Sequence, residues 1–355
     1  MKKKLGLLYG GQSAEHEVSL SSAKAVTEAL NYDKYDIVPV FITRQGEWIK
    51  GAVLTEPAKS IEALQFNIGK DGQHHDISSF LMAQKEQPFD AVFPLLHGTY
   101  GEDGTVQGLL EVLNIPYVGC GVLASSAGMD KVVMKQLFEI AGLNQVPFVY
   151  FIRKEWQANQ QELLDEMTSK LTFPMYVKPA NLGSSVGVSK ASTKEELIEA
   201  VTVAFKYDRK VIVETGVVGD EVEMAVLGND EPKVSVPGQI KATTDFYDYE
   251  SKYQDGNTEL LIPAPVSAEV ISTMSDMAIR AFKVLDGSGL VRADFFVTAD
   301  EEVLINEVNT LPGFTPMSMY PILWGNTGLA YSDLIEELIN LAIERFEEKQ
   351  QLHFK

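Results

Sequence analysis

Residues 291–297 have the sequence VRADFFV, and residues 303–309 have the sequence VLINEVN. In both segments, β-branched and aromatic residues surround a few polar ones, a composition typical of β-strands. The five residues 298–302 between them are too few for another element and include Asp300. The sequence therefore predicts two strands joined by a short turn.

The polar residues of these two strands are spaced so that they share faces. Side chains alternate across a strand, so Glu307 and Asn309 point to one side, as do Arg292 and Asp294. Asp294, Glu307 and Asn309 offer hard oxygen ligands with no histidine or cysteine nearby, a set that suits Mg²⁺ or Mn²⁺ bridging phosphates better than zinc. The residues alone are equally consistent with two amphipathic strands whose polar face meets solvent.

The composition is that of a large folded protein. At 355 residues the chain exceeds the usual size of one domain, so two or three packed units are expected. A formal charge of −20 opposes binding to nucleic acid or to an anionic membrane surface. Cys120 is the single cysteine, which excludes an internal disulfide and a cysteine metal cluster and fits a reducing cytoplasm.

The sequence contains no segment typical of export or membrane insertion. The start, MKKKLGLLYGG, has a basic region, but its apolar stretch ends at Gly10 and is too short for a signal peptide. No uninterrupted apolar run approaches the length needed to cross a bilayer. We therefore expect a cytoplasmic protein.

Hydrophobic periodicity and turn residues predict alternating strands and helices along the chain. Helices are predicted at 19–30, 106–113, 127–141, 157–169, 193–205, 266–285 and 332–348. Strands are predicted at 5–9, 37–42, 90–96, 117–118, 149–153, 175–178, 186–189, 211–213, 221–227 and 233–240, besides the opening pair. This order predicts a doubly wound α/β domain at 1–125, followed by α+β units at 126–214 and 215–355. A long polar and aromatic insert at about 240–260 is predicted to form a lid.

Two glycine-bearing segments could contact a nucleotide. In KPANLGSSVG at 178–187, a lysine ends a predicted strand and precedes a hairpin whose backbone N–H groups could close over phosphates. In VIVETGVVGDE at 211–221, free backbone groups could bind the edge of adenine, and Glu221 could bind ribose hydroxyls. A flexible hairpin with a surface lysine and an ordinary crossover explain the same residues.

Taken in order, the strand lysine, the glycine hairpin, the hinge glutamate, Arg-x-Asp and Glu-x-Asn resemble the ATP-grasp superfamily, in which two α+β lobes clasp ATP and magnesium. Other motifs narrow this resemblance and extend it over nearly the whole chain. They are similar to the D-alanine:D-alanine ligase family and read GGQSAEHEVS at 10–19, HGTYGEDG at 97–104, FYDYESKY at 246–253 and NTLPGFTPMS at 309–318. The resemblance implies a three-domain ATP-grasp architecture, with a doubly wound amino-terminal α/β domain and two lobes that clasp ATP.

The resemblance also implies roles in binding ATP and metal. Two Mg²⁺ or Mn²⁺ ions would be held by Asp294, Glu307 and Asn309, with Glu307 shared between them. The ATP contacts would be Lys131 and Lys178 on the phosphates, Glu214 and the backbone near Val217 on adenine, Glu221 on the ribose and Lys252 on the transferred phosphate. Separately, Lys131 could be a solvated helix residue.

A second group of implied roles concerns the amino acids. Glu15 would bind the ammonium group of the first D-alanine and form a hydrogen-bonded set with Ser184 and Tyr253. The remaining contacts would be His97 near the first substrate, Ser318 and Met319 near the carboxylate of the second, and Arg292 with the Gly313 N–H at the oxyanion. Taken singly, Glu15 could instead cap the amino end of the helix predicted from Ser19, His97 could be a turn histidine, and Ser318 could cap a turn.

The implied reaction is ligation of two D-alanines to D-alanyl-D-alanine through D-alanyl phosphate, with ATP converted to ADP and phosphate, which supplies a peptidoglycan precursor. Tyrosine at position 253 favours the dipeptide over a D-lactate product, and the resemblance implies a homodimer formed through the amino-terminal domain. A ligase using D-lactate or D-serine remains an alternative. A nucleotide-binding protein without catalysis would not need the arginine at 292, and a plain acidic α/β domain would not explain the ordered motifs.

Overall fold

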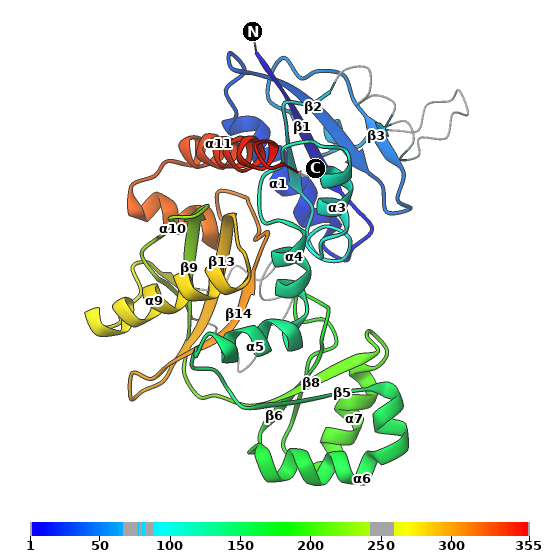
Figure 1. Ribbon diagram of the computed structural model, residues 1–355, viewed down its shortest axis with the longest axis vertical. Helices are drawn as coiled ribbons and strands as arrows, with labels where there is room; N and C mark the ends of the chain where they lie inside the picture. Colours follow the sequence, from blue (N-terminus) through cyan, green and yellow to red (C-terminus); the bar gives the residue numbers. More distant parts are fainter. Residues whose placement is uncertain (1, 67–76, 78–79, 82–87, 242–258, 354–355) are drawn as a thin grey trace.

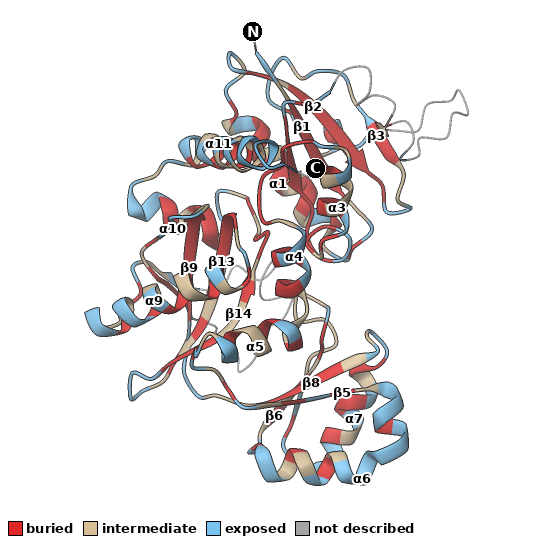
Figure 2. Cartoon of the chain, in the orientation of Figure 1, coloured by how far each residue is buried: buried red, intermediate tan, exposed pale blue. Residues whose placement is uncertain are grey.

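The computed structural model describes residues 2–66, 77, 80–81, 88–241 and 259–353. In this part of the chain, three β-sheets follow one another along the long axis of the molecule (Figure 1). Most residues of the strands are buried, whereas the exposed residues lie mainly on the outer sides of helices (Figure 2). The mixed α/β and α+β architecture agrees with the predicted fold class.

The amino-terminal sheet is largely parallel. Its strand order is β3-β2-β1-β4, with β1 parallel to both β2 and β4 and with β3 antiparallel at the edge. Helices α1 and α11 pack on one face, and α3 packs on the other. The bounds are β1 (Lys3–Gly10), β2 (Tyr35–Ile42), β3 (Trp48–Lys50), β4 (Ala91–Leu95), α1 (His16–Ala29), α3 (Thr105–Val112) and α11 (Tyr331–Gln350), with a short 3₁₀ helix at Glu62–Leu64.

This sheet presents its loops at the carboxyl ends of neighbouring parallel strands. The chain leaves β1 at Gly10 and enters α1 after Glu15, and it leaves β4 just before His97. Because β1 and β4 are adjacent and parallel, these two loops meet at one edge of the sheet. Ligands in doubly wound folds bind at such an edge.

The central sheet is a small antiparallel unit. Its order is β5-β8-β6-β7, and its core is formed with α6 and α7. The Thr193 hydroxyl caps α7 by accepting a hydrogen bond from the Glu196 N–H at 3.2 Å. The bounds are β5 (Phe148–Ile152), β6 (Met175–Pro179), β7 (Ser189–Ala191), β8 (Lys210–Thr215), α6 (Arg153–Lys170) and α7 (Lys194–Ala204).

The third sheet has the order β12-β11-β9-β13-β14, with β10 paired to the end of β9. One face packs on α5 and α9, and part of the other face packs on α10 and α11. The bounds are β9 (Asp220–Gly228), β10 (Lys233–Val234), β11 (Gly238–Lys241), β12 (Glu259–Leu261), β13 (Gly289–Val297), β14 (Val303–Asn309), α9 (Ala268–Val284) and α10 (Met319–Thr327).

Two helices also contact units other than those to which the predicted domain limits assign them. The terminal helix α11 packs against α1 and β4, so the amino-terminal and third sheets share one hydrophobic core. Helix α5 packs against α9 and β14 as well as against the central unit, where Val132 contacts Ala180 and Ile212. The limit at 125/126 falls inside helix α4 (Val122–Met129). The limits of the three domains therefore remain a prediction made from the sequence.

The prediction of a single helix at 127–141 is wrong, because the helix is interrupted at Asp130. Helix α4 ends at Met129, and α5 (Lys131–Ile140) begins after Asp130. Asp130 is extended, and its carboxylate accepts hydrogen bonds from the N–H groups of Val132 and Val133 at 3.1 and 3.2 Å. This cap fixes Lys131 at the first position of a helix.

Other differences from the predicted elements also have local causes. The strand predicted at 186–189 begins only at Ser189, because Gly187 within it adopts a left-handed φ of 75°, as Ser184 and Ser185 do just before it at 53° and 57°. The strand predicted at 233–240 is split into β10 and β11, with Pro237 between them, which has no N–H to donate. The predicted strand at 117–118 is a single parallel bridge between Tyr117 and Val92. Strands β3 and β12 and helix α10 were not predicted.

Among the residues that the structure describes, no helix combines the length and the apolar character needed to span a membrane.

Candidate active site

Two cavities adjoin at the centre of the molecule. The larger, of about 640 Å³, lies between the edge of the amino-terminal sheet and the third sheet. The smaller, of about 390 Å³, lies between the central and third sheets. Seven residues line both cavities: Lys131, Gly183, Ser184, Glu223, Ile240, Arg292 and Glu307.

Every predicted site residue that the structure describes lines at least one of these cavities. The larger cavity includes Glu15, His97, Lys131, Ser184, Arg292, Glu307, Asn309, Gly313, Ser318 and Met319. The smaller cavity includes Lys131, Lys178, Ser184, Glu214, Val217, Glu221, Arg292, Asp294 and Glu307. Tyr253 and Lys252, together with most of the predicted lid at 240–260, lie outside the described residues.

Glu15 and Ser184 meet across the larger cavity. The Ser184 hydroxyl donates to Glu15 Oε1 at 2.5 Å and so joins the loop before α1 to the glycine hairpin after β6. Glu15 is the N-cap residue of α1, but its side chain makes no capping hydrogen bond to that helix. Gly98 borders the same carboxylate, and a Cβ there would lie 2.7 Å from Glu15 Oε2.

His97 is buried beneath the larger cavity. Its Nδ1 lies 3.0 Å from the Leu311 carbonyl oxygen, and its Nε2 lies 3.3 Å from the Ser22 hydroxyl. Burial lowers the pKa of His97, and the nearby Glu15 carboxylate and the Leu311 carbonyl oppose this shift. His97 therefore links the loop after β4 to the loop after β14, besides lining the cavity.

Glu102 is a buried residue of this site for which no role was predicted. Its Oε1 accepts a hydrogen bond from the Gly98 N–H at 3.0 Å, and its side chain lines the larger cavity. Burial raises its pKa, and the Glu15 carboxylate adds to the shift, so that the pKa reaches about 8. At neutral pH this carboxyl group is therefore mostly protonated and able to donate as well as accept.

Strands β13 and β14 place the predicted metal ligands on one face. Their antiparallel pairing sets Arg292 opposite Asn309 and Asp294 opposite Glu307. The pairing of β13 with β9 adds Glu223 opposite Asp294. This confirms the prediction that the polar side chains of the two strands share a face.

The donor chemistry of this face fits a hard divalent cation, although its carboxylates are held by cations of the chain. Asp294 Oδ1 and Oδ2 accept from Arg292 Nε and Nη2, each at 2.7 Å, and Glu307 Oε2 lies 3.0 Å from Lys131 Nζ. Within the described part of the chain, no three histidine, cysteine, aspartate or glutamate side chains already form a metal-binding group. Two carboxylates and a carboxamide on neighbouring strands of one sheet suit Mg²⁺ or Mn²⁺.

The smaller cavity is bordered by a buried cluster of one carboxylate and two lysines. Glu214 Oε1 lies 3.1 Å from Lys135 Nζ, and Glu214 Oε2 lies 2.6 Å from Lys178 Nζ. Burial raises the pKa of Glu214, but Lys135 and Lys178 outweigh it and lower that pKa to about 2. Lys135, whose role was not predicted, is 1% exposed. Burial lowers its pKa, with Glu214 opposing, whereas Glu214 and Glu307 raise the pKa of Lys178 against the effect of burial.

The far side of the larger cavity is formed by the loop before α10. The Ser318 hydroxyl lies 3.0 Å from the Thr315 N–H and 2.9 Å from the Thr315 hydroxyl, so it closes this loop. Ser318 precedes α10 without capping it through its side chain. Gly313 packs against Ser318, since a Cβ on Gly313 would lie 3.1 Å from Ser318 Oγ.

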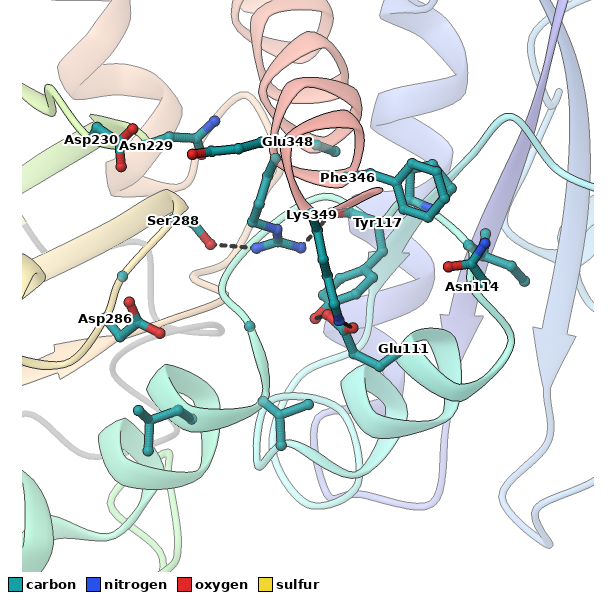
Figure 3. Close-up of a pocket in the computed structure, with 18 residues that line it drawn as sticks. Glu111, Asn114, Tyr117, Asn229, Asp230, Asp286, Ser288, Phe346, Glu348 and Lys349 are labelled. Carbon is teal, nitrogen blue, oxygen red and sulfur yellow. Dashed lines mark hydrogen bonds and ion pairs between the residues drawn. The ribbon is translucent and has the colours of Figure 1, made fainter. Parts of the chain in front are cut away.

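A third cavity, of about 490 Å³, lies away from these two, beside the end of α11 (Figure 3). Figure 3 shows Lys349 of α11 directed at Glu111 of α3, and Ser288 directed at an arginine of α11, which is Arg345. None of the predicted site residues within the described chain lines this cavity.

The adjoining cavities and the lobes around them define an ATP-grasp enzyme. Two family descriptions match the chain: "D-ala D-ala ligase N-terminus" at residues 4–120 and "D-ala D-ala ligase C-terminus" at residues 137–340. The chain belongs to the D-alanine–D-alanine ligase family.

Individual relatives match over almost the full length. The chain is 57% identical to the D-alanine–D-alanine ligase of Bacillus pumilus, over 99% of each sequence, and 56% identical to that of Bacillus licheniformis, also over 99% of each. Among solved structures, the D-alanine-D-alanine ligase from Coxiella burnetii is 34% identical with a TM-score of 0.80, covering 99% of this chain and 96% of that one. The VanG D-Ala:D-Ser ligase from Enterococcus faecalis is 37% identical with a TM-score of 0.84, covering 96% and 100%.

Proposed function

We propose that this chain joins two D-alanine molecules into D-alanyl-D-alanine, with ATP converted to ADP and phosphate, and so supplies a peptidoglycan precursor. One observation carries the proposal. The cavity bordered by Glu15 and Ser318 and the cavity bordered by Lys178 and Glu221 adjoin, and Arg292 lines both. A carboxylate on one side can therefore reach a phosphoryl group on the other.

The chemistry needs both cavities because a carboxylate is a poor acylating agent. In the proposed first step, a carboxylate oxygen of the first D-alanine attacks the γ-phosphorus of ATP, giving D-alanyl phosphate and ADP. In the second, the amine of the other D-alanine attacks the acyl carbon, and phosphate leaves with the bridging oxygen. Such transfers depend mainly on positioning and charge stabilisation.

In this proposal the smaller cavity holds ATP. Lys131 and Lys178 contact its phosphates, Glu214 and the backbone near Val217 border the adenine, and Glu221 contacts the ribose. The buried Glu214 carboxylate already bonds Lys135 and Lys178, which supports a role in fixing Lys178 at this end of the cavity.

Asp294, Glu307 and Asn309 would hold two Mg²⁺ or Mn²⁺ ions, which supply positive charge to the phosphates. The opposed positions of Asp294 and Glu307 on β13 and β14 support this assignment. Binding would require Asp294 to leave Arg292 and Glu307 to leave Lys131, because both carboxylates are paired now. The freed lysine would then carry its charge toward the phosphates.

The larger cavity would hold the amino acids. Glu15, kept in place by Ser184, would bind the ammonium group of the first D-alanine beside His97, and Ser318 and Met319 would border the carboxylate of the second. Arg292 and the Gly313 N–H would stabilise the oxyanion, and losing one such donor typically costs ~3 kcal/mol of transition-state stabilisation. Lys252 and Tyr253 would act from the lid, which we propose excludes water from the acyl phosphate.

Product identification tests this function. Purified protein is incubated with ATP, Mg²⁺ and D-alanine, with L-alanine in a parallel reaction, while ADP release and product mass are followed. We expect D-alanyl-D-alanine from the D-isomer alone, with one ADP per dipeptide. ADP release without dipeptide would refute the assignment.

Formation of D-alanyl-D-serine is a second candidate, favoured by the similarity to the D-Ala:D-Ser ligase from Enterococcus faecalis. Identity to D-alanine–D-alanine ligases is higher, at 52–57%, which favours the dipeptide of alanine. Equimolar D-alanine and D-serine, or D-alanine and D-lactate, would separate the products by mass.

We also propose that the protein acts in the cytoplasm as a homodimer formed through its amino-terminal domain. The sedimentation coefficient would test this assembly, since a monomer at micromolar concentration would contradict it.

A further inference from the structure

Arg292 has carboxylates on two sides. On its own strand, β13, it makes the two 2.7 Å hydrogen bonds to Asp294. On the neighbouring strand, β9, Glu223 Oε2 lies 2.9 Å from Arg292 Nε. Glu223 is 7% exposed and lines both cavities, so this contact is sheltered from water.

The sheet register places Glu223 beside the same Arg292 nitrogen, Nε, that donates to Asp294. Residues two apart on β9 share a face, and the pairing of β9 with β13 sets Ala225 opposite Arg292 and Glu223 opposite Asp294. Glu223 therefore approaches Arg292 diagonally across the ladder. Ala225, opposite Arg292 on β9, has only a methyl side chain.

In the proposed function, Asp294 has two incompatible partners. Both of its oxygens bond Arg292 now, and the same oxygens would bind a metal ion. When a metal binds Asp294, Arg292 loses both hydrogen bonds while it remains mostly buried, with 17% of its side chain exposed. A sheltered guanidinium without a carboxylate is strongly unfavourable, so metal binding needs a second partner for Arg292.

We propose that Glu223 is the positioning residue that holds Arg292 when Asp294 turns to the metal. Glu223 keeps the guanidinium at the wall shared by the two cavities, where the proposed oxyanion forms. It thereby makes Asp294 available to the metal without moving the arginine. This inference rests on the proposed metal-binding role of Asp294 and oxyanion role of Arg292.

Equilibrium binding of Mn²⁺ in the presence of ADP, followed by the electron paramagnetic resonance of free Mn²⁺, tests the inference. In Glu223→Gln, Arg292 keeps its two hydrogen bonds to Asp294 but loses the carboxylate on β9. We expect the Mn²⁺ dissociation constant to rise by about tenfold, because removing one partner of an ion pair that is sheltered from water is costly. Glu231→Gln, an exposed carboxylate beyond the end of the same strand, is the matched control and should bind as the unsubstituted protein does.

A double-mutant cycle separates positioning from a simple loss of negative charge near the metal. In an Arg292→Met background, Asp294 has no guanidinium to leave, so adding Glu223→Gln should not change Mn²⁺ affinity. If the tenfold loss persists in that background, Glu223 acts through its field and the inference is wrong. If Glu223→Gln binds Mn²⁺ normally in the presence of Arg292, the inference is also wrong.

Asp294→Asn distinguishes these outcomes from failure of the proposed function. If Asp294→Asn weakens Mn²⁺ binding and Glu223→Gln does not, only the positioning role fails. If Asp294→Asn binds Mn²⁺ normally, the metal assignment itself fails. Unfolding temperatures of all variants check that each is folded, and kcat for Glu223→Gln should fall at saturating Mn²⁺ with the KM for D-alanine little changed.

Discussion

Glu102 is a carboxyl group that folding leaves protonated at neutral pH. Its pKa rises from an ordinary 4.5 to about 8 because it is buried beside the Glu15 carboxylate. The folded protein therefore binds a proton here that the unfolded chain releases above pH 4.5. The stabilisation associated with this proton is complete below pH 4.5 and is lost as the pH rises to about 8, with an upper limit of ~5 kcal/mol.

Glu102→Gln should remove this pH dependence, since glutamine has the shape of a protonated glutamate and does not titrate. We expect the variant to gain stability relative to the unsubstituted protein as the pH rises from 5 to 8. Denaturant unfolding at several pH values measures the difference. A difference that is constant over this range would show that Glu102 has an ordinary pKa in the folded protein.

Lys135 is a buried ammonium group that shares Glu214 with Lys178. In Lys135→Met, Glu214 keeps Lys178 as its partner in this cluster, and the tighter pair should draw Lys178 away from the phosphates. We expect a KM for ATP about tenfold higher, an unchanged KM for D-alanine and a free energy of unfolding lower by ~3 kcal/mol. Lys206→Met, at an exposed position after α7, is the control. Equal effects on both substrates would contradict this role.

The site residues that the sequence predicted lie in short segments whose local pattern fixes their side chains. Strand alternation placed Glu307 with Asn309 and Arg292 with Asp294 on shared faces, whereas their roles followed from the resemblance to the ligase family. The same rule could have found Glu223, which is two residues from Glu221, and helical spacing could have found Lys135, one turn after Lys131. The pKa of Glu102 had no such signal, because its burial depends on residues far away in the sequence.

At the scale of elements, the break between α4 and α5 positions the phosphate end of the smaller cavity. Besides capping α5, the Asp130 carboxylate forms an ion pair with Lys210 and accepts from the Asn181 amide at 3.2 Å. It therefore ties the start of α5 to the central sheet and the glycine hairpin. Sequence periodicity predicted one continuous helix because 127–141 lacks proline and glycine apart from Gly128.

Asp130→Ala should loosen this junction. Loss of an amino-terminal cap typically costs ~1 kcal/mol, and Lys131 should then lose its fixed position at the shared wall of the cavities. We expect lower stability in chemical denaturation and a higher KM for ATP. Asp130→Asn retains a good cap but loses the ion pair with Lys210, so it should lose less stability than Asp130→Ala. If Asp130→Ala and Asp130→Asn lose equal stability, the amino-terminal cap does not contribute to the stability of this junction.

At the scale of the whole molecule, α11 joins the amino-terminal and third sheets. Arg345 donates to the carbonyl oxygens of Gly119 and Tyr117 at 2.5 and 3.1 Å and to the Ser288 hydroxyl, and its guanidinium lies 4.5 Å from the centre of the Tyr117 ring. The sequence predicted the helix but not its neighbours, because amphipathic periodicity shows which face is buried and not what covers it.

Arg345→Ala should weaken this junction without touching either cavity of the site. We expect the free energy of unfolding to fall by ~2 kcal/mol, since several hydrogen bonds from one charged group are lost. Lys349→Ala, one turn further along α11 and paired with Glu111 at the surface, should cost under ~1 kcal/mol. Thermal unfolding compares the two, and a change in KM for ATP or D-alanine would contradict a purely structural role.

The central claim is that a carboxylate oxygen of D-alanine bound in the larger cavity is transferred to the phosphate released from ATP bound in the smaller cavity. D-Alanine labelled with ¹⁸O in its carboxylate is incubated with ATP, Mg²⁺ and the protein, and the released phosphate is analysed by mass. If the carboxylate attacks ATP and the acyl phosphate is then opened by the second amine, one ¹⁸O atom appears in phosphate for each dipeptide formed. Dipeptide accompanied by unlabelled phosphate would contradict the account.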